Sequence, residues 1–165
     1  MKRIGIAALC LLLLLPQIGC GEKTSAPKDG VYVVGKHIKA EQITEFYYTV
    51  ATSAFPPHYQ RYRFFKEDGA YRFFHETREG DHFPLTEADA TATGTVTLTA
   101  EQWEQFLACI DGGTVIARQE HLEDGDAGPW LYLYWDGDPG DVQEFAFWTL
   151  QSRADFETFC ERLIG

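Results

Sequence analysis

The chain has 165 residues, of which 45% are apolar, 15% aromatic and 24% charged. This apolar content excludes a disordered chain, and no run reaches the ~18 apolar residues of a membrane-spanning helix. Fourteen basic and 25 acidic residues give a net charge of −11, which excludes nucleic acid as a partner and disfavours anionic lipid surfaces. We therefore expect one folded domain of about 145 residues behind an N-terminal leader.

The first twenty residues have the pattern of an export signal. Two basic residues precede a 12-residue apolar run, Ile4–Leu15, and Pro16 ends that run. A small residue, Gly19, then directly precedes Cys20. This segment resembles the lipobox of bacterial lipoproteins, with Gln17 standing where the family usually has leucine. The rest of the chain is similar to uncharacterised small exported lipoproteins.

The resemblance implies cleavage after Gly19 and a diacylglycerol group on the sulfur of Cys20. Two acyl chains on one cysteine give stable anchoring, whereas one chain binds reversibly. The expected location is therefore the cell membrane, on its extracytoplasmic side, with the lipid anchor as the contact to the membrane. An ordinary secretory leader cleaved after Ala26 is the alternative. The predicted organisation is a signal peptide over 1–19, a lipidated flexible tether over 20–41 and a single α+β domain over 42–165.

The first predicted strand covers Ile43–Thr52, where β-branched and aromatic residues alternate. Pro56 and Pro57 then indicate a loop, because proline cannot donate a hydrogen bond to a sheet. The segments 60–67 and 70–77 flank Asp68 and Gly69, two residues that tolerate positive φ. This pattern predicts a β-hairpin with a two-residue turn.

The turn also fixes which residues of the hairpin face each other. Phe65 is expected opposite Arg72, and Arg63 opposite Phe74, all on one face. Such arginine–aromatic pairs contribute about 0.5–1 kcal/mol each. These four residues form the candidate binding face. The opposite face of the hairpin, expected to pack on the core, carries Tyr62, Phe64, Tyr71, Phe73 and His75.

Two helices are predicted after the hairpin. A short strand over Gly94–Leu98 precedes the first helix, which begins after Thr99 with a Thr99/Gln102 capping box and ends at Gly112. Ser152 is expected to cap the second. The apolar stripes are Trp103, Phe106, Leu107 and Ile110 in the first helix, and Phe156, Phe159, Cys160 and Leu163 in the second. Strands are predicted between the helices over 114–118, 129–135 and 142–150.

This order of elements predicts an α+β fold, because no strand–helix–strand alternation is present. We expect a single, mainly antiparallel sheet with two helices packed on one face. Two helices can cover only one face of an aromatic-rich sheet. The other face is then either covered by loops or a surface for binding.

Cys109 and Cys160 are the two cysteines that remain after the leader and Cys20 are set aside. Outside the cytoplasm two such thiols can pair, and their bond would close a loop of about 50 residues. Both cysteines also lie on or beside the apolar stripe of a predicted helix, where buried thiols are expected. The pair is therefore a candidate disulfide, with two buried free thiols as the alternative.

No motif in the sequence predicts catalysis, a cofactor or a metal. His75–Glu79 differs by one residue from the zinc motif H-E-x-x-H and ends a predicted strand, where side chains four apart do not share a helix face. The acidic turns Asp124–Asp126 and Asp136–Asp138 lack the remaining ligands of a calcium loop. The sequence favours a membrane-anchored, non-catalytic module that binds an unknown protein or small ligand. A lipid-anchored hydrolase or metal-dependent enzyme is the alternative.

Overall fold

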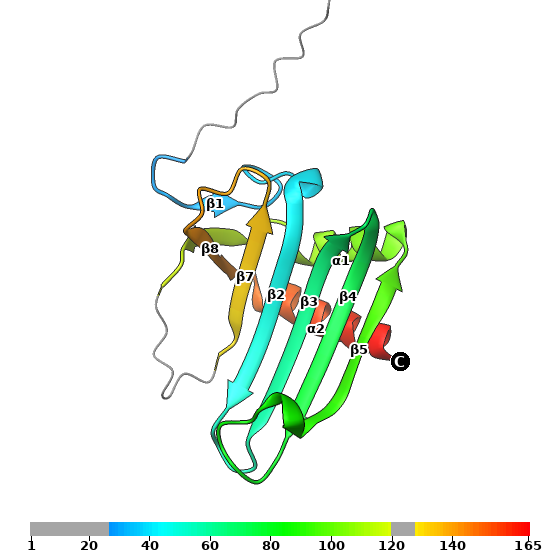
Figure 1. Ribbon diagram of the computed structural model, residues 1–165. Coiled ribbons are helices and arrows are strands. Elements are labelled where there is room, and N and C mark those ends of the chain that lie inside the picture. The colour runs from blue at the N-terminus through cyan, green and yellow to red at the C-terminus, as the bar shows by residue number, and fades with distance from the viewer. Residues whose placement is uncertain (1–26, 120–127) are drawn as a thin grey trace, which may run out of the picture.

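The computed structural model describes residues 27–119 and 128–165, which form one sheet and two α-helices (Figure 1). The helices are α1 (Ala100–Ile110) and α2 (Leu150–Ile164), and the 3-10 turns are η1 (Ala40–Gln42) and η2 (Glu87–Asp89). The strands are β1 (Tyr32–Val33), β2 (Ile43–Thr52), β3 (His58–Glu67), β4 (Ala70–Glu79), β5 (Ala90–Leu98), β6 (Thr114–Ala117), β7 (Trp130–Trp135) and β8 (Val142–Ala146).

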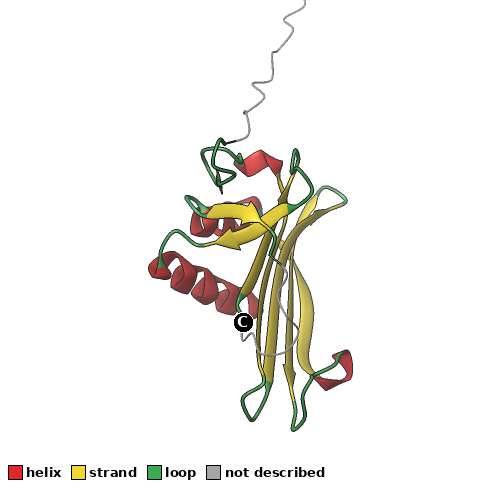
Figure 2. Cartoon of the chain, turned by 90° about the vertical axis from the view of Figure 1, so that its left-hand side faces the viewer, coloured by secondary structure: helices red, strands yellow, loops and turns green. Residues whose placement is uncertain are grey.

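The sheet has eight strands in the order β1-β6-β8-β7-β2-β3-β4-β5, and all neighbouring strands are antiparallel. Both α-helices lie on the same face of this sheet, and within 27–119 and 128–165 no α-helix lies on the other face (Figure 2). The fold is therefore α+β, with a single antiparallel sheet and two helices on one face, as the sequence predicts. Among the described residues, no helix is long and apolar enough to cross a membrane.

The hairpin of β3 and β4 forms at the predicted turn. Asp68 and Gly69 have φ values of 50° and 75°, which is the left-handed region that this turn needs. Glu67 pairs with Ala70, and the register continues without a shift to the far end of both strands. Phe65 therefore lies opposite Arg72, which confirms the predicted pairing.

The first helix also begins and ends as predicted. The Thr99 hydroxyl accepts the backbone N–H of Gln102 at 3.1 Å, and the Gln102 side chain accepts the N–H of Thr99 at 2.8 Å. These two bonds satisfy donors that have no partner within the helix. Gly112, with φ at 71°, ends α1. Trp103, Phe106 and Ile110 are buried.

The second helix begins earlier than predicted. Thr149, not Ser152, is the N-cap residue, and its hydroxyl accepts the N–H of Ser152 at 3.0 Å. The predicted strand over 142–150 correspondingly ends at Ala146. Thr149 can cap the helix because it precedes Ser152 by three residues, as Thr99 precedes Gln102. The strand ends early because the alternation of buried and exposed side chains stops after Phe145. Three members of the predicted stripe, Phe156, Phe159 and Cys160, are buried, and the fourth, Leu163, is half-buried.

The packed domain begins before residue 42, so the predicted limit of the tether is wrong. The short strand β1 pairs with β6, and Val34 and Ile38 are buried in the core. The N–H of Val33 donates to Nδ1 of His37 at 3.1 Å, which closes the turn between these two residues. The pairing of β1 with β6 and the burial of Val34 and Ile38 together hold this segment against the sheet.

The core between the sheet and the helices is largely aromatic. The Phe64 ring is stacked on Phe106 of α1, with centroids 4.2 Å apart and planes 3° apart. It also contacts Phe73 at 4.8 Å and Phe156 of α2 at 5.8 Å. The hydroxyl of the buried Tyr48 donates to Glu157, which ties β2 to α2. Burial raises the pKa of Tyr48 well above its usual value.

Candidate functional site

The sheet face turned away from the helices carries arginine and aromatic side chains in cross-strand rows. Because side chains alternate along a strand, the neighbours of buried core residues point to this face. The registers place the side chains in three rows across β7, β2, β3, β4 and β5. We call these residues the open face: Tyr132, Tyr47, Arg63, Phe74 and Thr95; Tyr134, Glu45, Phe65, Arg72 and Thr97; Trp130, Thr49, Arg61, Glu76 and Thr93.

Arg63 lies at the centre of the open face and is fixed from three sides. Its guanidinium carbon is 4.2 Å from the ring centroid of Phe65 and 5.4 Å from that of Tyr47. Its Nε donates to the carboxylate of Glu45 on the neighbouring strand. Burial and the Glu45 carboxylate together raise the pKa of Tyr47 to about 12, so this ring stays neutral under the cation.

Glu76 is a buried carboxylate that two arginines hold on the same face. Its side chain is 6% exposed and lies 2.7 Å from an Arg61 nitrogen and 2.8 Å from an Arg78 nitrogen. The hydrogen bond to Glu76 holds the pKa of Arg78 above its usual value. Arg78 also lies over the Tyr59 ring at 4.5 Å, and Arg61 lies over Phe74 at 5.3 Å. Each guanidinium is therefore fixed by a ring and a carboxylate.

The open face differs in charge from the rest of the chain. Arg72 donates to the Thr97 hydroxyl at the β5 side, and Arg118 lies over the Tyr132 ring at 4.5 Å at the β7 side. Five arginines thus lie on or beside the described part of this face, together with the carboxylates of Glu45, Glu67, Glu76 and Glu144. The whole chain carries a net charge of −11. On a chain this acidic, a face with slightly more arginines than carboxylates is suited to a partner with carboxylate or phosphate groups.

No family model, curated protein or solved structure matches this chain.

All four residues of the predicted binding face lie together on the open face. Arg63 and Phe74 are direct cross-strand partners, as are Phe65 and Arg72. All four are half-buried, because rings and guanidinium groups cover one another. The predicted hairpin turn identified these four residues, because it fixes the register of β3 with β4. It did not identify their neighbours Glu45 and Tyr47, because the loop between β2 and β3 does not reveal the register of those two strands.

The residues considered for metal or acid–base chemistry do not converge. His75 and Glu79 lie in β4, and not in a helix, and burial lowers the pKa of His75. Asp138 accepts the N–H of Gly140 at 2.7 Å, as is typical of an acidic turn. Within 27–119 and 128–165, no group of three or more histidine, cysteine, aspartate or glutamate residues could hold a metal ion. The turn at Asp124–Asp126 lies outside the described residues.

Cys109 and Cys160 are free thiols in the structure, in the two neighbouring helices. Cys109 is half-buried and Cys160 is buried, and burial raises the pKa of both thiols. Thiols with raised pKa values are poor nucleophiles, so neither one is suited to nucleophilic catalysis. A disulfide between them stays a prediction. Comparing the mass of the chain before and after reduction would test it. Cys20, the predicted lipid attachment, lies outside the described residues.

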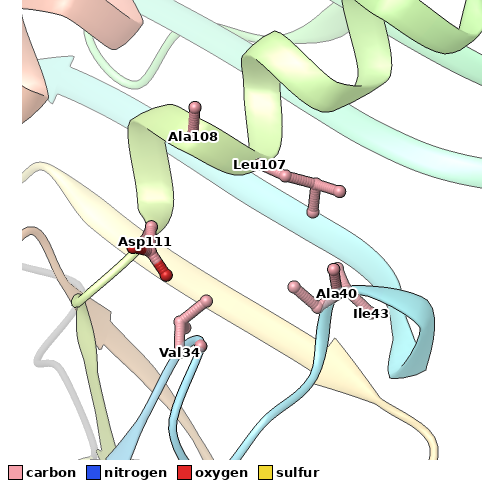
Figure 3. A pocket seen from close by; sticks show the side chains of 7 residues that line it. Val34, Ala40, Ile43, Leu107, Ala108 and Asp111 are labelled. Atoms are coloured by element: carbon pink, nitrogen blue, oxygen red, sulfur yellow. The ribbon is translucent and has the colours of Figure 1, made fainter.

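A cavity of about 290 Å³ lies between the end of α1 and the N-terminal segment (Figure 3). Leu107 and Ala108 of α1 lie on one side of it, and Val34 and Ile43 lie on the other. Asp111 supplies the one carboxylate of its lining. Its size is at the lower limit for small-molecule sites, and a single exposed carboxylate has no partner there for acid–base work. The cavity therefore supports no catalytic function.

Proposed function

We propose that this chain is an exported lipoprotein, anchored through Cys20 on the extracytoplasmic side of the cell membrane. Its folded domain is a non-catalytic module that binds a partner through the open face. The observation that carries the proposal is the arginine–aromatic array on a sheet face that neither of the two described α-helices covers (Figure 2). The leader sequence supports the anchor, and the array supports the binding function.

The composition of the open face is that of a protein-binding surface. Tyrosine, tryptophan and arginine are the residues that contribute most to binding energy in interfaces. The guanidinium group of Arg63 is already held by Phe65, Tyr47 and Glu45, so binding would order it at little further entropic cost. A face rich in positioned arginines favours a partner that presents carboxylate or phosphate groups to them.

Site-specific photo-crosslinking of the full chain, in the cells that produce it, tests this proposal. A photoreactive phenylalanine analogue at Phe74 should give a covalent adduct with the partner. Phe83 is the matched control, because it is a phenylalanine with 51% exposure in the loop between β4 and β5. Adducts from position 74 and none from position 83 support the proposal. If position 83 gives as much adduct as position 74, or if position 74 gives no adduct, the open face is not the binding site.

A further inference from the structure

The last strand of the sheet, β5, has an unusual edge. β5 lies at the right-hand side of the sheet and pairs with β4 on one side only (Figure 1). It is nine residues long, whereas β1 at the opposite edge has two. From Ala90 to Leu98 it contains no charged residue and no proline. Most of its side chains are exposed.

Proteins usually protect an edge strand from pairing with another chain. They shorten it, place lysine or proline on it, or twist it with a bulge. In β5 the register with β4 shifts once, between Thr77 and Arg78, and the segment Ala92–Leu98 then pairs in regular register. Along this segment every second residue directs its backbone N–H and C=O groups outward, away from β4, and none of these protections interrupts it. This edge is suited to the addition of a further strand.

The regular segment Ala92–Leu98 is close to symmetric about its central residue, Thr95. Thr93, Thr95 and Thr97 point to the open face, and small or apolar residues occupy the alternating positions. An antiparallel copy centred on Thr95 would place Thr95 opposite itself and Thr93 opposite Thr97. On the other face, Gly94 would lie opposite Val96. Threonine pairs across antiparallel strands are stabilising, and this register uses the whole regular segment.

We propose that two copies of this chain associate through β5, which pairs with itself around a two-fold axis at Thr95. Such an interface is isologous, since the same surface of each copy contributes to it. Charge favours this location, because the chains carry a net charge of −11 each and repel, and β5 contributes no charge to the contact. The two sheets become one continuous sheet. The two open faces then form one surface on the same side of it.

Cysteine scanning along β5 of the full chain tests the pairing. Directly opposite residues of antiparallel strands are about 4.5–5.5 Å apart, which suits a disulfide. A Thr95→Cys chain, extracted in detergent and mildly oxidised, should run as a covalent dimer on a non-reducing gel. Thr91→Cys is the matched control on the same strand, because its two copies would lie about 27 Å apart. The unsubstituted chain sets the background from the native cysteines.

Two further chains separate a specific register from random contact. A mixture of Thr93→Cys and Thr97→Cys chains should crosslink more than either chain alone. Thr95→Lys should convert the dimer to a monomer by light scattering, with an unchanged circular dichroism spectrum. Equal crosslinking of Thr95→Cys and Thr91→Cys overturns the proposal. An unsubstituted chain that is monomeric at high concentration also overturns the proposal. In that case the partner of the β5 edge would be an extended peptide and not a second copy.

Discussion

Replacing Phe64 with alanine should lower the free energy of unfolding by about 4 kcal/mol, since large aromatic truncations in cores cost about 3–5 kcal/mol. Phe64 is fully buried and lies where the sheet meets both helices. Its ring is stacked on Phe106 and lies against Phe156 and Phe159. Alanine would leave a cavity that these rings cannot fill without moving. Denaturant unfolding followed by tryptophan fluorescence measures the loss.

The next residue provides a matched control for the same measurement. Phe65→Ala removes a ring of equal size on the open face, where it contacts the Arg63 guanidinium. That substitution should cost only about 1 kcal/mol, the value of a cation–π pair with partial burial. The ratio of the two decreases in the free energy of unfolding tests whether only one face of the sheet is packed as a core. Equal losses would mean that the open face is packed as tightly as the core.

Replacing Cys20 with serine should release the chain from the membrane fraction. The predicted anchor is two acyl chains, and at about 0.8 kcal/mol per buried CH₂ its removal abolishes stable membrane binding. Cell fractionation measures the distribution, and intact mass shows whether the diacylglycerol is present. Cys10→Ser is the control, because Cys10 lies within the apolar run and is predicted to leave with the leader. A Cys20→Ser chain that stays in the membrane fraction would contradict the lipid anchor.

Local signals in the sequence predicted much of the fold. The Asp68–Gly69 turn set the register of β3 and β4, and the capping box at Thr99 set the start of α1. The predictions failed where the pattern was weak or long-range. β5 starts at Ala90 and not at Gly94, because alternating alanine and threonine show no apolar face. Val34 and Ile38 are held by distant parts of the chain, which local patterns do not reveal.

The candidate site could be predicted only as far as one hairpin. The turn placed Arg63 and Arg72 on the same face, because it fixes both strands at once. Glu45 and Arg118 join the site through pairings that cross loops, and so need the strand order β6-β8-β7-β2-β3. The burial of Glu76 between two arginines also depends on packing around it. Composition showed that the strands are rich in aromatic residues, but left open whether the second face is covered or a binding surface.

The affinity of the open face for its partner is the most direct test of this account. The dissociation constant of the partner captured through position 74 would be measured for three full chains, each checked for unchanged unfolding. These are the unsubstituted chain, the Arg63→Ala/Arg72→Ala double variant, and Arg162→Ala, whose exposed arginine lies on α2. The double variant should bind about tenfold more weakly or worse, and Arg162→Ala should bind normally. A double variant that binds as tightly as the unsubstituted chain would contradict the central claim.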